Sequence, residues 1–366
     1  MKKEQQLSVA DETLQQSAIN LLKTLIATPS YSKAEERTAS VIESFLSEHG
    51  IETKKHLNNV WCVNKYSEPR LPTVLLNSHH DTVKPNPGYT VDPFTPLVKD
   101  GKLFGLGSND AGGALVSLIA AFIHYYNKKD LPFNIVLAAT GEEEISGENG
   151  VEALLPYLPP IEAAVVGEPT LLQLAIAERG LMVLDCTATG KAGHAARQEG
   201  ENALYKAMND IRWFREYQFN KVSPLLGPVQ MTVTSIETEN KAHNVVPAKC
   251  DFIVDVRINE LYSMDEVMNE ISSHIKSEIH PRSTRLRSTN IALDHPLVKA
   301  GISMGSKCYG SPTTSDKALM PFPSLKAGPG DSARSHTADE FIFVDEVRKG
   351  IEFYVKLLDA VRFNDR

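Results

Sequence analysis

Histidine and carboxylate side chains gather in five short polar turns of this sequence, and each turn follows an apolar run. The run TVLL leads to NSHHDTV, which places His79, His80 and Asp81 together. The other four turns contain Asp110, Glu142, Glu143, Glu144, Glu168 and His336. Taken singly, each turn has an ordinary explanation, such as a helix cap, a solvated charge run or a surface histidine. Taken together, they supply imidazole and carboxylate groups, which are metal ligands.

A metal site requires that these five turns lie close together in the fold. Open α/β sheets bind ligands at the edge formed by the carboxyl ends of their strands. If the five runs are parallel strands, the turns meet at that edge, where their carboxylates repel one another unless a cation neutralises them. Histidine and carboxylate ligands without cysteine suit Zn²⁺, Co²⁺ or Mn²⁺. Five ligands exceed the needs of one catalytic zinc ion and fit two ions that share a bridging carboxylate.

The apolar pattern predicts the elements that position the turns. Apolar runs alternate with helical patterns over residues 1–173, which indicates an α/β fold with a mostly parallel sheet flanked by helices. Residues 174–290 follow the order β-α-β-β-α-β, which predicts an inserted α+β domain with a four-stranded sheet and two helices on one face. The α/β pattern returns over residues 291–366. We therefore predict a metal-binding catalytic domain, 1–173 and 291–366, interrupted by a second domain. Within the insert, LAIAERGLMVLDCTATG is predicted to be one long strand, and STRLRSTNI is the candidate for the last strand.

Composition limits the class of protein. The 366 residues, 42% hydrophobic and 23% charged, are typical of a globular chain long enough for two domains. A net charge of −8 argues against nucleic acid and anionic membranes as partners. The longest apolar stretch, ALVSLIAAFI, is too short to span a bilayer, and MKKEQQLSVADE at the start lacks the apolar core of a secretory signal. The four cysteines show no metal-binding or redox spacing, so we expect reduced thiols in a cytoplasmic protein.

Five motifs in order resemble those of the M20 metallopeptidase family, and within it the group of acetylornithine deacetylase and succinyl-diaminopimelate desuccinylase. SHHDTV matches a His-x-Asp motif and GLGSNDAGG matches a Gly-x-Gly-x-x-Asp motif. TGEEEISG matches a paired-glutamate motif, VVGEPT a Gly-Glu-Pro-Thr motif, and GPGDSARSHTADE the final histidine motif. The resemblance covers nearly the whole chain, including the inserted domain.

The resemblance implies a role for each of these residues. Five of them would bind two divalent metal ions, most simply zinc, with cobalt or manganese as alternatives: His79, Asp110, Glu144, Glu168 and His336. Asp110 would bridge the two ions. Asp81 would orient His79, and Glu143 would be the general base that takes a proton from the attacking water. His80 is interpreted as structural, and Glu142 as a supporting acid.

The resemblance also implies roles for the inserted domain, which corresponds to a lid and dimerisation domain. His194, in GKAGHAAR, would reach into the active site of a partner subunit and donate a hydrogen bond to the oxyanion. Asn244 and Arg257 would hold the substrate, the arginine through a bidentate grip on a carboxylate. A homodimer through this domain is therefore expected.

The implied activity is hydrolysis of an amide bond that joins an acyl group to an amino acid. N-acetylornithine, in arginine biosynthesis, is the expected substrate. N-succinylornithine, N-acetylcitrulline, succinyl-diaminopimelate and dipeptides remain alternatives, because the motifs do not determine acyl selectivity. A catalytically inactive relative that binds amino-acid derivatives is an alternative of another class, although its expected mark, a lost ligand or base, is not present.

Overall fold

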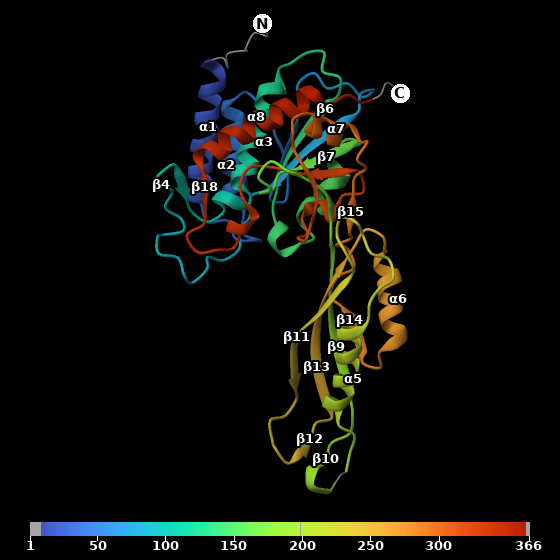
Figure 1. Ribbon diagram of the computed structural model, residues 1–366. Helices are drawn as coiled ribbons and strands as arrows, with labels where there is room; N and C mark the ends of the chain where they lie inside the picture. Colours follow the sequence, from blue (N-terminus) through green and yellow to red (C-terminus); the bar gives the residue numbers. More distant parts are fainter. Residues whose placement is uncertain (1–8, 198, 364–366) are drawn as a thin grey trace. The chain divides into compact units, whose positions relative to one another are not determined.

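The computed structural model describes residues 9–197 and 199–363 (Figure 1). The first eight residues, which form most of the stretch without a secretory-signal core, lie outside the described residues. By its contacts the chain forms two compact units. The first unit comprises Met1–Ile176, Ile291–Tyr309 and Ser315–Arg366, and the second comprises Ala177–Asn290 and Gly310–Thr314. Within the described part of the chain, no helix has the length and apolar character needed to cross a membrane.

The division into units differs slightly from the predicted domain limits. The first boundary lies after Ile176 rather than after residue 173, and the short segment Gly310–Thr314 joins the second unit. Hydrogen bonds explain this assignment, because Arg179 N donates to Ser311 O at 3.2 Å and Thr314 Oγ1 donates to Arg179 O at 3.0 Å. Such pairing between distant parts of the chain leaves no periodic signal in the sequence.

A mixed sheet forms the centre of the first unit. Its strands, in spatial order, are β1 (Lys54–His56), β2 (Asn59–Val63), β6 (Asn134–Thr140), β3 (Thr73–His79), β7 (Ala163–Val166), β17 (Ser324–Lys326) and β8 (Leu174–Glu178). β16 (Cys308–Ser311) also pairs with β8, and β15 (Thr289–Asn290), which belongs to the second unit, pairs with the last two residues of β8, Ala177 and Glu178. The central strands β6, β3, β7 and β17 are mutually parallel, whereas β1, β2, β8 and β15 pair antiparallel. The predicted α/β fold with a mostly parallel sheet is confirmed, with antiparallel strands toward its edges.

Both faces of this sheet are apolar, and both are covered. In β3, Val74 and Leu76 point into one core and Leu75 points into the other. The larger core contains α1 (Val9–Ile26), α2 (Glu36–Glu48), α3 (Gly113–Tyr126), α7 (Pro296–Ser303) and α8 (Val344–Ala360). The smaller core includes α4 (Val151–Leu154). Every residue of α3 from Ala114 to Phe122 is buried, so packing on all sides fixes the position of this helix.

A small three-stranded sheet accompanies the central one. Its order is β18 (Phe341–Phe343), β5 (Lys102–Phe104) and β4 (Leu97–Lys99), and Phe341 pairs with Phe104. The run KLFGLGSN therefore forms a strand of this small sheet and not of the central sheet, which corrects the expectation that all five turns follow strands of one sheet. The pairing brings residues just before α3 beside residues just before α8.

The second unit has the predicted order β-α-β-β-α-β. It is formed by β9 (Gly180–Thr189), α5 (Ala203–Glu216), β11 (Gln230–Thr238), β13 (Lys249–Ile258), α6 (Met264–His274) and β14 (Glu278–Pro281). The sheet order is β11-β13-β9-β14, with all pairs antiparallel. Buried side chains alternate along β9 and β13 and pack against α5 and α6, so both helices lie on one face. β10 (Gly193–His194) and β12 (Val245–Val246) form a separate two-stranded ribbon.

Two strand predictions in this region are wrong. LAIAERGLMVLDCTATG forms two strands, β8 and β9, which are separated at Arg179. A Cβ on Gly180 would lie 2.5 Å from Ser288 N and 2.8 Å from Leu286 O, so the close approach of a neighbouring backbone at this break leaves room only for glycine. The last strand of the four is β14, whereas STRLRSTNI contributes only the short β15, which pairs with β8.

Candidate metal centre

Strand register brings the polar turns after β3, β6 and β7 to one level of the central sheet. His79, the last residue of β3, pairs with Thr140 at the end of β6. Val166 of β7 pairs with the residue two positions before His79, so Glu168 reaches the level of His79. The glutamate turn follows directly after β6. These turns share an edge because the strands that precede them are parallel, as expected.

Asp110 reaches the same edge by another route. It lies in the turn Ser108–Gly112, immediately before α3, and its own backbone is not helical. In a right-handed β-α-β crossover the helix begins near the end of the first strand, which places the start of α3 beside the end of β3. A Cβ on Gly112 would lie 2.4 Å from Gly107 O, so the tight turn requires glycine. The sequence pattern thus predicts the correct edge but the wrong supporting element.

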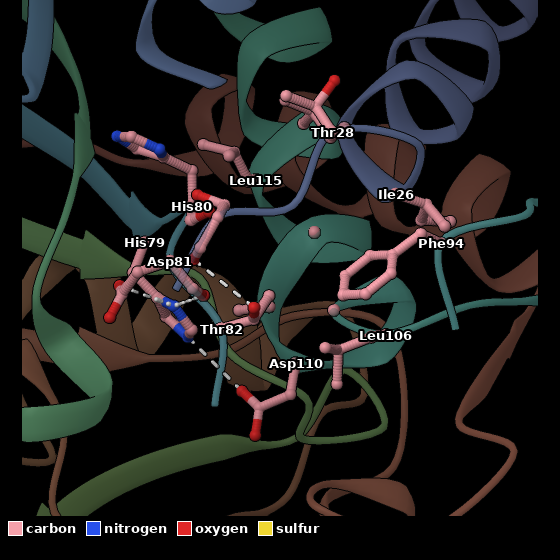
Figure 2. A pocket seen from close by; sticks show the side chains of 15 residues that line it. Ile26, Thr28, His79, His80, Asp81, Thr82, Phe94, Leu106, Asp110 and Leu115 are labelled. Carbon is pink, nitrogen blue, oxygen red and sulfur yellow. Dashed lines mark hydrogen bonds and ion pairs between the residues drawn. The ribbon is translucent and has the colours of Figure 1, made fainter. Parts of the chain in front are cut away.

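Asp110 is the centre of the cluster because its two carboxylate oxygens face two histidines. Oδ1 lies 3.4 Å from His79 Nε2, and Oδ2 lies 3.6 Å from His336 Nε2. Glu168 Oε1 lies 3.7 Å from His79 Nε2, and Glu144 Oε2 lies 2.9 Å from His336 Nε2. Figure 2 shows the Asp110 carboxylate against the His79 imidazole. The structure therefore brings all five predicted ligands together.

The separations of Asp110 from His79 and from His336, 3.4 and 3.6 Å, fit donors that share metal ions. Two atoms bound to one tetrahedral Zn²⁺ at about 2.0–2.2 Å lie about 3.3–3.6 Å apart. The donors divide into a His79–Asp110–Glu168 side and a His336–Asp110–Glu144 side, with Asp110 common to both. The set contains imidazole and carboxylate but no thiolate, which suits borderline divalent cations.

Geometry alone does not separate Glu143 from the ligands. Its Oε2 lies 3.9 Å from His79 Nε2, and it groups with His79 and Glu168 within 4.8 Å. Burial raises the pKa of Glu143 well above its usual value, and the charges of Glu168, Asp316 and Glu144 act in the same direction, against that of His79. A carboxyl group that takes up a proton more readily than an ordinary glutamate is suited to general acid–base work.

Crowded negative charge also changes the protonation of the surrounding groups. Burial alone would lower the pKa of His79, but hydrogen bonds to Asp110 and a second aspartate raise it well above its usual value. The hydrogen bond to Glu144 raises the pKa of His336 to about 9. Burial, with the charge of Asp110, raises the pKa of Glu340 to about 8. Each of these shifts favours the protonated form of its group, which indicates a local excess of negative charge that divalent cations would offset.

Asp81 holds both His79 and the glutamate turn. His79 Nδ1 lies 3.3 Å from Asp81 Oδ1 and 3.0 Å from the backbone oxygen of Asp81. The carboxylate also accepts the backbone N–H groups of Glu143 and Glu144, at 3.1 and 3.2 Å, and the Ser32 hydroxyl at 2.7 Å. The contact with His79 fits the predicted orienting role of Asp81. The same carboxylate also holds the backbone of the turn that contains Glu143, the proposed base.

His80 and Glu142 support the centre from outside. The two ring nitrogens of His80 lie 2.9 Å from Thr38 Oγ1 and 3.0 Å from Asn58 O, and burial lowers its pKa to about 4. A neutral imidazole with both nitrogens engaged fits the structural interpretation of His80. The Glu142 carboxylate accepts Asn149 Nδ2 at 3.0 Å and so closes the loop that follows the glutamate turn.

Two buried acids near the centre are not predicted by the motifs. Asp316 accepts Asn77 Nδ2 and Thr140 Oγ1, both at 2.8 Å, and burial raises its pKa to about 6. Glu340 accepts three backbone N–H groups of the loop before α3. Its sequence signal is weak, because a position four residues after His336 matches no metal-ligand spacing.

A small cavity adjoins the candidate metal centre (Figure 2). Its volume is about 20 Å³, and its lining combines His79 and Asp110 with the apolar side chains of Phe94, Leu106 and Leu115. This is room for about one water molecule. The cavity is therefore too small to hold an acylated amino acid.

The second unit brings His194 and Asn244 together but separates them from Arg257. β10 pairs with β12, and the backbone N–H of Ala195 donates to Asn244 O at 3.0 Å. The His194 and Asn244 side chains are both exposed. β13 begins at Lys249, close to β12 in sequence, and Arg257 lies near its other end. At about 3.3 Å per residue, the intervening strand is roughly 25 Å long.

Arg257 has a neighbour, Arg179, that the motifs do not predict. Arg257 donates to both carboxylate oxygens of Asp255, at 2.8 and 3.0 Å. It pairs with Leu181 of β9, and Arg179, just before β9, lies near enough for the charge of Arg257 to act on it. Arg179 is 8% exposed and donates from Nη2 to Leu226 O, while its buried Nη1 has no hydrogen-bond partner among the described residues. Burial and the charge of Arg257 lower its pKa, and a carboxylate would relieve both effects.

Known proteins share the sequence pattern and the fold of this chain. Residues 75–360 match the model of Peptidase family M20/M25/M40. Over 278 residues the chain is 26% identical to succinyl-diaminopimelate desuccinylase 2 of Ruegeria sp. (strain TM1040), which covers 71% of this chain and 69% of the relative. Aminopeptidase PepT from Bacillus cereus ATCC 10987 superposes with a TM-score of 0.76 at 18% identity, over 94% of this chain and 98% of that one. The Bacillus subtilis YXEP protein, a dinuclear metal-binding peptidase from the M20 family, gives 0.72 at 15% identity, over 95% and 98%.

We predict that Asp81→Asn weakens the binding of Zn²⁺ or Co²⁺ by about 10- to 100-fold. Asparagine keeps only one oxygen, so its amide nitrogen, which cannot accept, faces the N–H of either Glu143 or Glu144, and the anchor shared by the turn and the His79 ring is weakened. Calorimetric titration of the metal-free protein measures the affinity. Asp92→Asn is the control, since Asp92 is exposed and braces a turn outside the cluster. Wild-type affinity in Asp81→Asn would contradict this role.

Proposed function

This chain belongs to peptidase family M20/M25/M40, and from that premise we propose that it is a two-metal deacylase that removes a dicarboxylic acyl group, of the succinyl type, from an amino acid. Membership of the family gives the broad class, a metal-dependent hydrolase that acts on amide bonds. The two-metal part of the proposal rests on one observation. The two carboxylate oxygens of Asp110 face His79 and His336 separately, at 3.4 and 3.6 Å.

Five residues would hold the two ions in this proposal. His79 and Glu168 would bind one ion, His336 and Glu144 the other, and Asp110 both. Zinc is the proposed metal, with cobalt or manganese as alternatives, because this ligand set does not distinguish strongly among them. The fit is electrostatic as well as geometric, since a buried cluster of carboxylates needs positive charge to stay ionised.

The proposed chemistry divides between the cations and Glu143. When bound, a pair of divalent cations polarises an amide carbonyl and makes water acidic enough to lose a proton near neutral pH. Glu143 takes that proton as the water oxygen attacks the carbonyl carbon. It returns the proton to the amide nitrogen as the C–N bond breaks, which leaves a carboxylic acid and an amine. Glu144 is less suited to this task, because its Oε2 is bonded to His336 at 2.9 Å.

The proposed acyl group is anionic because the second unit contains an arginine with a spare donor. Arg179 Nη1 is buried without a hydrogen-bond partner among the described residues, and Arg257 is its neighbour. We propose that these two arginines hold the free carboxylate of a succinyl-type chain, while Asn244 contacts another part of the substrate. Relatives named succinyl-diaminopimelate desuccinylase support the same choice. N-acetylornithine, the substrate expected from the sequence, has less support, because its one carboxylate belongs to the amino acid and its acetyl group presents no charge to these arginines.

The active form is proposed to be a homodimer through the second unit. His194 and Asn244 are separated from Arg257 by most of a strand roughly 25 Å long, so one copy of this unit cannot bring all three to one small substrate. β11 is an edge strand whose residues are largely exposed, with Ile236 at 46%, and such an edge can pair with another strand. The His194 imidazole of one copy would then donate a hydrogen bond to the carbonyl oxygen that becomes negative in the other.

The assay that tests this function compares N-succinyl-L-diaminopimelate with N-acetyl-L-ornithine, with added Zn²⁺ or Co²⁺ and with a chelator as control. We expect chelator-sensitive hydrolysis that favours the succinyl substrate. In Glu143→Ala the turnover should fall by about 100- to 10,000-fold while the metal content stays at the wild-type level, because the proton acceptor is lost but the ligands remain. Glu148→Ala, an exposed glutamate nearby, should keep full activity. Undiminished turnover in Glu143→Ala would rule out the assigned base.

Arg179→Met tests the acyl selectivity. The substitution removes the guanidinium and keeps most of the stem, so kcat/KM for the succinyl substrate should fall by about 10- to 100-fold, as expected for a lost charge-assisted hydrogen bond. The value for the acetyl substrate should change little. Arg282→Met is the control, since this exposed arginine pairs with Asp185 elsewhere in the second unit. An equal fall for both substrates would assign Arg179 to folding instead.

Mixing two inactive variants tests the homodimer. Glu143→Ala lacks the base and His194→Ala lacks the oxyanion donor, and each should be nearly inactive alone. If subunits of a symmetric dimer exchange at random, about a quarter of the sites regain both groups. Recovery of activity on mixing is the expected result, with the dimeric mass measured by light scattering. No recovery from subunits that have exchanged would show that His194 does not act across the dimer.

A further inference from the structure

We infer that Glu340 is the positioning residue for the bridging aspartate: its buried carboxylate fixes the backbone of residues 107–110 and so sets the Asp110 carboxylate between the two metal positions. This inference rests on the two-metal proposal made above. It assigns Glu340 no contact with substrate or metal, only a role that acts through Asp110.

The small three-stranded sheet places Glu340 beside the loop of residues 107–110. β18 and β5 pair so that Phe341 lies opposite Phe104, and Gly105 N donates to Glu340 O at 3.0 Å. Backbone pairing between the two strands therefore fixes the position of Glu340 next to this loop. Its side chain is 2% exposed and points into the loop rather than into solvent.

The Glu340 carboxylate then accepts three backbone N–H groups of the loop. Oε1 accepts those of Asn109 and Asp110 at 2.8 and 3.0 Å, and Oε2 accepts that of Gly107 at 3.1 Å. Three hydrogen bonds to one buried side chain therefore hold the backbone on both sides of Asn109. The position of the Asp110 carboxylate, 3.4 Å from one histidine and 3.6 Å from the other, depends on that backbone.

The same loop is tied to the segment that contains His336. Asn109 Nδ2 donates to Asp331 O at 3.0 Å, and Asp331 N donates to Asn109 Oδ1 at 3.0 Å. His336 and Glu340 follow Asp331 in one continuous stretch. The loop before Asp110 is therefore held to residues 331–340 at two points, through Asp331 and through Glu340. The same segment contains His336. Loosening Glu340 should disturb the metal positions without removing any ligand.

The test is a metal titration of Glu340→Gln. The amide oxygen can still accept the N–H groups of Asn109 and Asp110, but the amide nitrogen then faces the N–H of Gly107. We expect the affinity for at least one of two Co²⁺ or Zn²⁺ ions to fall by about 10- to 100-fold, measured by calorimetry and by the visible absorption of Co²⁺ on the metal-free protein.

Asp339→Asn is the matched control. Asp339 adjoins Glu340 and braces a loop in the same manner, since it accepts Thr90 N at 2.8 Å, Thr90 Oγ1 at 2.6 Å and Val91 N at 3.3 Å. That loop contains no proposed ligand, so metal affinity should stay at the wild-type value. An equal loss in Asp339→Asn would mean general loosening and would overturn the inference.

The remaining outcomes are also decisive. Wild-type affinity in Glu340→Gln overturns the inference while leaving the two-metal proposal intact. Wild-type protein that binds fewer than two ions overturns that proposal, and the inference with it. If Glu340→Gln does not fold, Glu340→Asp keeps the charge and shortens the reach by one methylene. A weaker metal affinity is then expected in Glu340→Asp, and an unchanged affinity would refute the positioning role.

Discussion

The repulsion among carboxylates gathered around Asp110 is the constraint on which the rest of this structure depends. Glu143, Glu144 and Glu168 converge on two histidines with Asp110 between them, and burial weakens the screening of their charges. The pKa values of Glu143 and His336 are both raised, in part by the charges of neighbouring carboxylates. A pair of divalent ions would offset this repulsion with charges that do not dissociate at neutral pH. The acid-rich edge is therefore best understood together with the ions that it would hold.

The backbone, with the help of a few side chains, holds these mutually repelling carboxylates in place. Parallel register sets His79 level with the residues after β6 and β7, and one carboxylate, Asp81, joins the His79 ring to the glutamate turn. In the same way, Glu340 accepts the backbone N–H of Asp110. Both braces accept backbone N–H groups, and for that reason they control where a neighbouring ligand points. The proposed ligands are thus held by hydrogen bonds to the main chain rather than by packing alone.

Local rules explain which of these features the sequence could predict. His79 and Glu168 follow apolar strands, and the order of elements in the second unit follows from its periodicity, so these features were accessible. The grouping of the five ligands was accessible mainly through the resemblance of their motifs to a known family. Glu340 was not, because its contact with Asp110 joins residues 230 positions apart through pairing of two three-residue strands. The position of Arg179 could not be predicted for a related reason. It depends on the break between β8 and β9, where a distant part of the backbone comes close, and secondary-structure propensities carry no information on such a contact.

Charge also connects the proposed substrate with the proposed ions. An acylated amino acid with free carboxylates is repelled by a centre rich in aspartate and glutamate, so its binding requires positive charge at two places. Cations at Asp110 would supply one, beside the carbonyl to be attacked, and the spare donor of Arg179 would supply the other, for the end of the acyl chain. A neutral acetyl group would use only the first of these charges and leave a buried guanidinium donor unsatisfied, which is itself unfavourable. Selectivity for a dicarboxylic acyl group would then arise less from extra attraction than from the cost of leaving Arg179 unpaired.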